Sequence, residues 1–174
     1  SAKRFAFAAL GRGKPMLTIV DARSPGRREE MRVPGLDEIF NPSWSPDGSR
    51  VVFSAPKGGE SDLFVFTLAT RGLTQVTSDA YADLHPAWSP DGKTIAFASD
   101  RFTTSLDDLR FGPLRLALLE VDGNRIRGAH MDGSRAKQIN PQWSPDGKSL
   151  FFISDLTGVS DVYRLDLADA RALQ

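Results

Sequence analysis

The chain is 174 residues long, and its 22 lysines and arginines balance its 22 aspartates and glutamates. This balance argues against a nucleic-acid partner, because proteins that bind nucleic acid carry a basic face. The lack of any cysteine excludes disulfides and thiolate metal ligands. No apolar run approaches the roughly 18 residues of a membrane-spanning helix, so no membrane span is predicted. Length and composition fit one folded domain or a piece of one.

The first segment of the chain is predicted to hold three strands. Residues 1–9 align with residues 47–55, where a strand follows a turn, and residues 16–21 and 28–33 supply two more strands. The alignment places the start of the chain at a turn inside a repeat. The strand and the tryptophan that precede this turn in the later repeats are therefore expected to be missing here.

The phrase Trp-Ser-Pro-Asp-Gly occurs three times and contains every tryptophan of the protein. Proline presets the φ of the first central turn position, aspartate suits the second, and glycine follows where a left-handed residue is wanted. A short run of β-branched and aromatic residues follows each phrase, so each is predicted to be a tight hairpin between two strands. The tryptophans are expected to pack between neighbouring repeats. The residues with this structural role are Trp44, Pro46, Asp47, Gly48, Trp88, Pro90, Asp91, Gly92, Trp143, Pro145, Asp146 and Gly147.

The spacing of the phrases predicts a β-propeller. The first two tryptophans are 44 residues apart and the next interval is 55, and a period of about 40–45 residues with four strands per unit is typical of propeller blades. The predicted fold is all-β, a propeller or propeller segment of four-stranded antiparallel blades. The blades are expected at 1–38 (incomplete), 39–82, 83–138 and 139–174 (incomplete). Because propellers close with about 4–8 blades, we expect the remainder of a larger propeller, or a second copy, to complete the ring.

The sequence Pro-x-Trp-Ser-Pro-Asp-Gly, then an apolar strand, then Ser-Asp, resembles the WD40-like (PD40) repeat of TolB-type bacterial β-propellers. Ala55-Pro56 departs from this pattern, because Ser99-Asp100 and Ser154-Asp155 stand at the matching places. The resemblance implies a periplasmic or extracellular bacterial scaffold that binds a protein or peptide. Two alternatives stay open: the gating propeller of a peptidase whose catalytic domain lies outside this chain, and a propeller that binds a sugar or another small ligand.

A polar residue followed by proline precedes each tryptophan: Asn41, His85 and Asn140. In a propeller the first strand of each blade lines the central channel, so these side chains are predicted to form a polar ring at a channel mouth, with Asp83 and Glu38 nearby. The alternative is that they cap the local turn or the start of the strand, as asparagine commonly does.

Residues 100–113 form an insertion that accounts for most of the extra length of the third blade. Its mixture of charged and apolar side chains suits a contact surface, with Phe102, Arg110 and Phe111 as candidates, because loops on a rigid scaffold often carry function. The alternative is a loop that folds back and covers an edge of its own blade.

No catalytic site or cofactor site is predicted. His85 and His130 lie in different blades without further ligands at metal-binding spacing, and the sequence has no Gly-x-Ser-x-Gly nucleophile elbow. The chain is therefore expected to be no enzyme and to hold no metal or cofactor.

Overall fold

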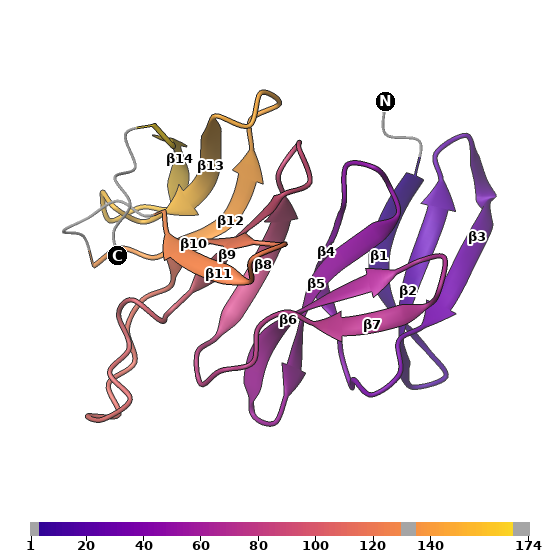
Figure 1. The fold of residues 1–174 in the computed structure, drawn as a ribbon, viewed down its shortest axis with the longest axis horizontal. Coiled ribbons are helices and arrows are strands. Elements are labelled where there is room, and N and C mark those ends of the chain that lie inside the picture. Colours follow the sequence, from indigo (N-terminus) through magenta and orange to yellow (C-terminus); the bar gives the residue numbers. More distant parts are fainter. Residues whose placement is uncertain (1–3, 130–134, 169–174) are drawn as a thin grey trace.

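The computed structural model describes residues 4–129 and 135–168. Within these residues, fourteen strands form four antiparallel sheets that follow one another along the chain. The sheets stand side by side in a row, and the first and last lie at opposite ends of the long axis (Figure 1). This confirms the predicted all-β fold of antiparallel blades.

Each sheet is a meander in which neighbouring strands are also neighbours in sequence. The first sheet contains β1 (Arg4–Gly11), β2 (Lys14–Asp21) and β3 (Ser24–Arg32). The second contains β4 (Phe40–Trp44), β5 (Arg50–Lys57), β6 (Glu60–Thr67) and β7 (Gly72–Gln75). The third contains β8 (Asp83–Trp88), β9 (Thr94–Ser99), β10 (Arg115–Glu120) and β11 (Arg125–Gly128). The fourth contains β12 (Gln138–Trp143), β13 (Ser149–Ser154) and β14 (Asp161–Asp166).

The first strands of the last three sheets form one continuous row. Strand β4 contacts β8, and β8 contacts β12, whereas β7 and β11 form the opposite edges of their sheets. We call β4, β8 and β12 the inner strands. Corresponding residues of the three repeats are therefore neighbours in space along this row.

The core consists of three apolar layers, one between each pair of adjacent sheets. Because successive side chains of a strand point to opposite faces, Val51 and Phe53 of β5 pack toward the first sheet, and Val52 packs toward the third. In the same way Ala96 of β9 and Phe152 of β13 share the last layer. Both faces of each central strand are thus apolar, as the short unbroken apolar runs require.

The Ser-Pro-Asp-Gly turns form the same hydrogen bonds at all three places. In the first turn the Ser45 hydroxyl donates to the Asp47 carboxylate at 2.6 Å and accepts from the amide of Arg50 at 2.9 Å. The amide of Gly48, which has a φ of 69°, donates to the carbonyl of Ser45 at 2.9 Å. The Ser45 contacts hold the pKa of Asp47 at about 2. Serine, aspartate and glycine therefore each have a separate role in closing the hairpin.

The tryptophans lie between adjacent sheets. Trp88 is 6% exposed and belongs to the layer between the second and third sheets. Trp44 and Trp143 are partly buried against the first and last layers. The indole Nε1 of Trp143 donates to the carbonyl of Ala87 on the neighbouring inner strand at 3.0 Å, so this ring is tied to the preceding sheet.

The Ser-Asp pair that ends the second strand of a sheet fastens the inner strand beside it. The carboxylate of Asp100 accepts the amide of Ala82 at 2.9 Å, and that of Asp155 accepts the amide of Lys137 at the same distance. Each accepted amide lies directly before an inner strand. The second sheet has Pro56 at this position, which offers no such acceptor.

The outward faces of the end sheets are apolar and exposed. Phe5 and Phe7 of β1 are 57% and 45% exposed, and Val162 of β14 is 66% exposed. By strand register Val162 corresponds to Leu63 of the second sheet, which is fully buried against the third sheet. The end faces therefore have the pattern of faces that another sheet covers.

Candidate functional site

Each inner strand contains a bulge at the place where a polar residue is followed by proline. In β4 the strand register shifts between Phe40 and Ser43, and β8 and β12 shift at the corresponding places. The residue before the proline has a left-handed backbone each time, with φ of 51° at Asn41, 55° at His85 and 53° at Asn140. Asparagine and histidine are among the non-glycine residues enriched in this conformation. The left-handed backbone by itself therefore explains why asparagine or histidine recurs at this position.

The bulges bring the three side chains around one cavity of about 280 Å³. The cavity runs across all three inner strands, and two residues that the sequence analysis missed, Ser43 and Gln142, also line it. Within the described part of the chain, the side chains of Asn41 and Asn140 form no hydrogen bond. They therefore do not cap a local turn, and their amide groups are available to a ligand.

His85 occupies the centre of this row and is half-buried. Its Nδ1 atom is buried and has no hydrogen-bond partner, and burial lowers the pKa of the imidazole below its usual 6.5. The ring is therefore neutral near pH 7.

We expect His85→Asn to flatten the dependence of stability on pH. Because the folded-state pKa of His85 is lowered, the unfolded chain takes up the proton first as the pH falls below about 6.5, and the free energy of unfolding falls with it. Asparagine keeps the left-handed backbone, as at Asn41 and Asn140, but does not titrate. Urea denaturation between pH 7.5 and 5 measures this. His130 is present in both the unaltered chain and the variant. Equal slopes of unfolding free energy against pH for the two would therefore contradict the expected role of His85.

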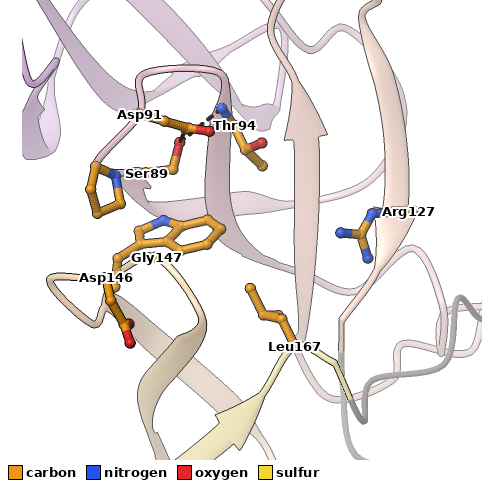
Figure 2. A pocket seen from close by; sticks show the side chains of 9 residues that line it. Ser89, Asp91, Thr94, Arg127, Asp146, Gly147 and Leu167 are labelled. Carbon is orange, nitrogen blue, oxygen red and sulfur yellow. Dashed lines mark hydrogen bonds between the residues drawn. The ribbon is translucent and has the colours of Figure 1, made fainter.

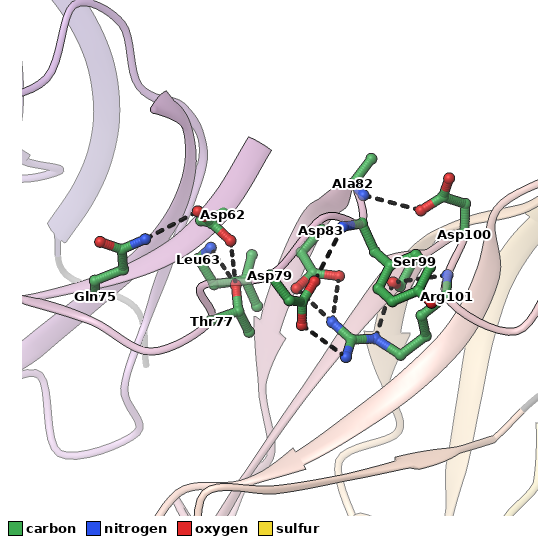
Figure 3. A network of polar contacts seen from close by, with 11 residues as sticks. Asp62, Leu63, Gln75, Thr77, Asp79, Ala82, Asp83, Ser99, Asp100 and Arg101 are labelled. Carbon is green, nitrogen blue, oxygen red and sulfur yellow. Dashed lines mark hydrogen bonds and ion pairs between the residues drawn. The ribbon is translucent and has the colours of Figure 1, made fainter. Parts of the chain in front are cut away.

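Asp83 does not line this cavity. Its side chain is fully buried in an ion pair with Arg101, whose Nη2 lies 2.7 Å from one carboxylate oxygen and 2.9 Å from the other (Figure 3). The same guanidinium lies 3.1 Å from the more exposed Asp79 and 3.1 Å from the Ser99 hydroxyl. Burial raises the pKa of the Asp83 carboxyl, and Arg101 opposes that rise. Asp83 thus fastens the inner strand β8, and Arg101 was missed by the sequence analysis.

The insertion of residues 100–113 extends away from the sheets (Figure 1). Its base is held by the Thr103 hydroxyl, which donates to the carbonyl of Pro113 at 2.7 Å. An isolated bridge between Ser105 and Arg110 joins the two arms farther out. Phe111 is 83% exposed and Phe102 is 39% exposed. The loop is therefore not folded over an edge of its blade.

The insertion and the cavity are close along the same strands. The insertion follows Ser99, the residue that pairs with Asp83, and Asp83 is two positions from His85. Arg110 forms an exposed ion pair with Asp108 at 2.9 Å. Phe102, Arg110 and Phe111 are thus placed on the same end of the sheet at which the inner strand begins.

His130 lies outside the described residues. Among residues 4–129 and 135–168 there is no group of three or more histidines and acidic residues that could hold a metal ion. In the same residues the structure has no helix long and apolar enough to cross a membrane.

A row of antiparallel sheets of three or four strands, with an inner strand beginning each of the last three and a tryptophan between neighbours, is the architecture of a β-propeller. Residues 1–105 match the model of the TolB beta propeller domain (PD40). The chain belongs to this family, as the repeat pattern predicted.

Its relatives include the Tol-Pal system protein TolB of Bordetella pertussis. That protein is 32% identical over 156 residues, which cover 88% of this chain and 33% of the relative. The chain thus spans about a third of the length of this curated relative. The crystal structure of TolB from Acinetobacter baumannii superimposes with a TM-score of 0.77 at 24% identity, over 98% of this chain and 40% of that one.

The same fold also occurs in enzymes. Tricorn protease superimposes with a TM-score of 0.65 at 19% identity, over 88% of this chain and 14% of its own length. An oligogalacturonate lyase in complex with manganese gives 0.68 at 20% identity, over 97% of this chain and 49% of its own. At these identities the likeness concerns the fold alone.

Proposed function

We propose that this chain is a propeller scaffold without catalytic activity of its own, which binds a protein or peptide at the cavity of the inner strands. The observation that carries the proposal is the placement of Asn41, His85 and Asn140 around that one cavity. Amide groups and a neutral imidazole can each donate and accept hydrogen bonds. They suit the backbone and polar side chains of an extended peptide.

The insertion supports the same proposal. Its exposed Phe111 and Leu109, 83% and 77% exposed, project from the end of the sheet at which β8 begins. Aromatic residues are enriched at protein interfaces. A ligand that enters the cavity from this end would meet the insertion as a second contact.

The family gives the proposed setting. The curated relatives are named Tol-Pal system proteins, so we infer that this chain is part of a bacterial exported protein and acts in the periplasm or outside the cell. The exposed apolar end faces, with Phe5, Phe7 and Val162, are inferred to be covered by further blades of the same protein or by a second copy.

The test uses peptides selected from a displayed library against the immobilised chain. Glycine is the substitution of choice, because it removes the side chain and keeps the left-handed backbone, which alanine does not favour. We expect the triple variant Asn41→Gly, His85→Gly, Asn140→Gly to bind the selected peptides at least about tenfold more weakly, which is equivalent to about 1.4 kcal/mol of binding free energy. Calorimetric titration measures the affinities.

The matched control is Asn124→Gly. Asn124 also has a positive φ, 46°, but it lies in the turn between β10 and β11, away from the cavity. Its affinities should equal those of the unaltered chain. Selected peptides that bind the triple variant as well as the unaltered chain would show that recognition takes place elsewhere.

A further inference from the structure

At two of the three contacts between sheets, an arginine covers the tryptophan of the next sheet. The guanidinium carbon of Arg4 lies 4.9 Å from the centre of the Trp44 ring, and that of Arg50 lies 4.7 Å from the centre of the Trp88 ring. Arg4 also donates to the carbonyl of Gly48 in the neighbouring turn at 3.1 Å. Each guanidinium thus lies over a ring face, a favourable cation–π arrangement.

The third contact has the same frame and lacks the arginine. Thr94 stands where the other two sheets have Arg4 and Arg50. The backbone amides of Thr94 and Arg50 form equivalent hydrogen bonds, because each donates to the hydroxyl of its turn serine at 2.9 Å. The adjacent turns also stack alike, with Pro46 against Gly92 and Pro90 against Gly147. The backbone could therefore carry a long side chain at position 94, but the sequence places a short one there.

A cavity of about 450 Å³ lies at this contact. Trp143, Thr94 and Gly147 line it, together with Asp91 and Asp146 of the two turns (Figure 2). The bond from the Trp143 indole to the carbonyl of Ala87 holds the ring in place. In the described residues no arginine or lysine lies over the Trp143 ring. The cavity therefore offers an aromatic face that a cation covers in the two equivalent places.

The charges around the cavity are unevenly distributed. The hydroxyls of Ser89 and Ser144 hold the pKa values of Asp91 and Asp146 below their usual range, so both carboxylates are ionised at neutral pH. Arg127 of β11 lies on the side opposite Asp91 and Asp146 (Figure 2). The carboxylates and the ring thus favour a cation on the side of the turns, and Arg127 opposes one on the other side.

We propose that this cavity, between the third and fourth sheets, is a binding site for a guanidinium group, supplied by an arginine side chain of a protein partner. The incoming group would take the place that Arg4 and Arg50 fill at the other two contacts. It would stack on Trp143 and donate to the turn that contains Gly147, as Arg4 does to Gly48. This site is separate from the cavity of the inner strands, and it does not depend on the function proposed there.

The test follows the Trp143 indole N–H signal by NMR, assigned by its loss in Trp143→Phe. N-acetyl-arginine methylamide serves as the probe, and we expect a saturable shift with a dissociation constant in the millimolar range. Thr94→Arg should abolish the shift and raise the melting temperature by about 2 °C, because it supplies the missing contact within the chain. Thr94→Val, which keeps the cavity open, should retain the shift.

Further measurements on the same N–H signal do not depend on the folding of Thr94→Arg. Arg127→Gln removes a like charge and should tighten binding of the arginine probe several-fold; weaker binding would overturn the proposed charge arrangement. An equal response to N-acetyl-lysine methylamide, or a larger one to N-acetyl-glutamate methylamide, would overturn the assignment to guanidinium. Binding of agmatine without binding of the blocked arginine would replace the protein partner by a small guanidino compound.

Discussion

Replacement of Trp88 by alanine is expected to lower the free energy of unfolding by about 3–5 kcal/mol, the usual cost of removing a large aromatic side chain from a core. Trp88 is 6% exposed, packs with Val52 and Phe97 in the layer between the second and third sheets, and is covered by Arg50. The substitution would open a cavity between two sheets and leave the guanidinium without its ring. Urea denaturation followed by far-ultraviolet circular dichroism measures the loss.

Trp44 provides the matched control, because it has the same turn phrase and the same kind of arginine contact. It is only partly buried, so Trp44→Ala should cost clearly less than Trp88→Ala. A loss of unfolding free energy below about 1 kcal/mol for Trp88→Ala, or equal losses for the two variants, would contradict this prediction. Either result would show that the tryptophans are peripheral and do not stabilise the contact between adjacent sheets.

The repeated phrase was sufficient to predict the fold, because its information is local. Serine, proline, aspartate and glycine close a turn through bonds within six residues, as between Ser45 and Arg50. The short apolar run that follows, rich in β-branched and aromatic residues, is typical of a buried strand. Few folds are compatible with a chain that repeats such a unit. The family match and the four antiparallel sheets agree with that prediction.

The grouping of Asn41, His85 and Asn140 could also be predicted, because equivalent positions of successive blades are neighbours. The left-handed bulge at each could not, because it depends on how the inner strand pairs with the strand beside it. That pairing decides which side chains share a face. It places Gln142 in the cavity and leaves Asp83 out.

Contacts between residues that are far apart in sequence were the least predictable. Arg101 reaches Asp83 across 18 positions, and nothing in the local pattern marks them as partners. The exchange of arginine for threonine at position 94 was visible in the sequence. Its meaning emerged only when Arg4 and Arg50 were seen to lie over the tryptophans of the next sheet.

Replacement of Arg101 by methionine is expected to cost about 3–5 kcal/mol of unfolding free energy at pH 7, the usual result of breaking a buried ion pair from one side. Methionine has a similar length but no charge, so the Asp83 carboxylate, which is 0% exposed, would remain buried without a cation. Urea denaturation at pH 7 and pH 4 measures the effect.

The dependence on pH separates a lost charge from lost packing. Without Arg101, burial raises the pKa of Asp83 further above its value in the unfolded chain, so the folded state binds the proton more tightly. The stability that this proton contributes is present below about pH 3.9 and is lost as the pH rises, so the deficit of Arg101→Met should be larger at pH 7 than at pH 4. Addition of Asp83→Asn should recover part of it at pH 7.

Asp79→Asn is the matched control, because it removes the other carboxylate bound to the same guanidinium. Asp79 has a side chain that is 34% exposed, and an exposed ion pair contributes about 0–1 kcal/mol. Its loss should therefore be small and nearly independent of pH. If Asp79→Asn cost as much as Arg101→Met, the ion pair with Asp79 would account for the loss. If the two pH values gave Arg101→Met the same deficit, the guanidinium would act through its contacts with Tyr81 and Phe97. In either case the buried charge of Asp83 would not be what makes Arg101 necessary.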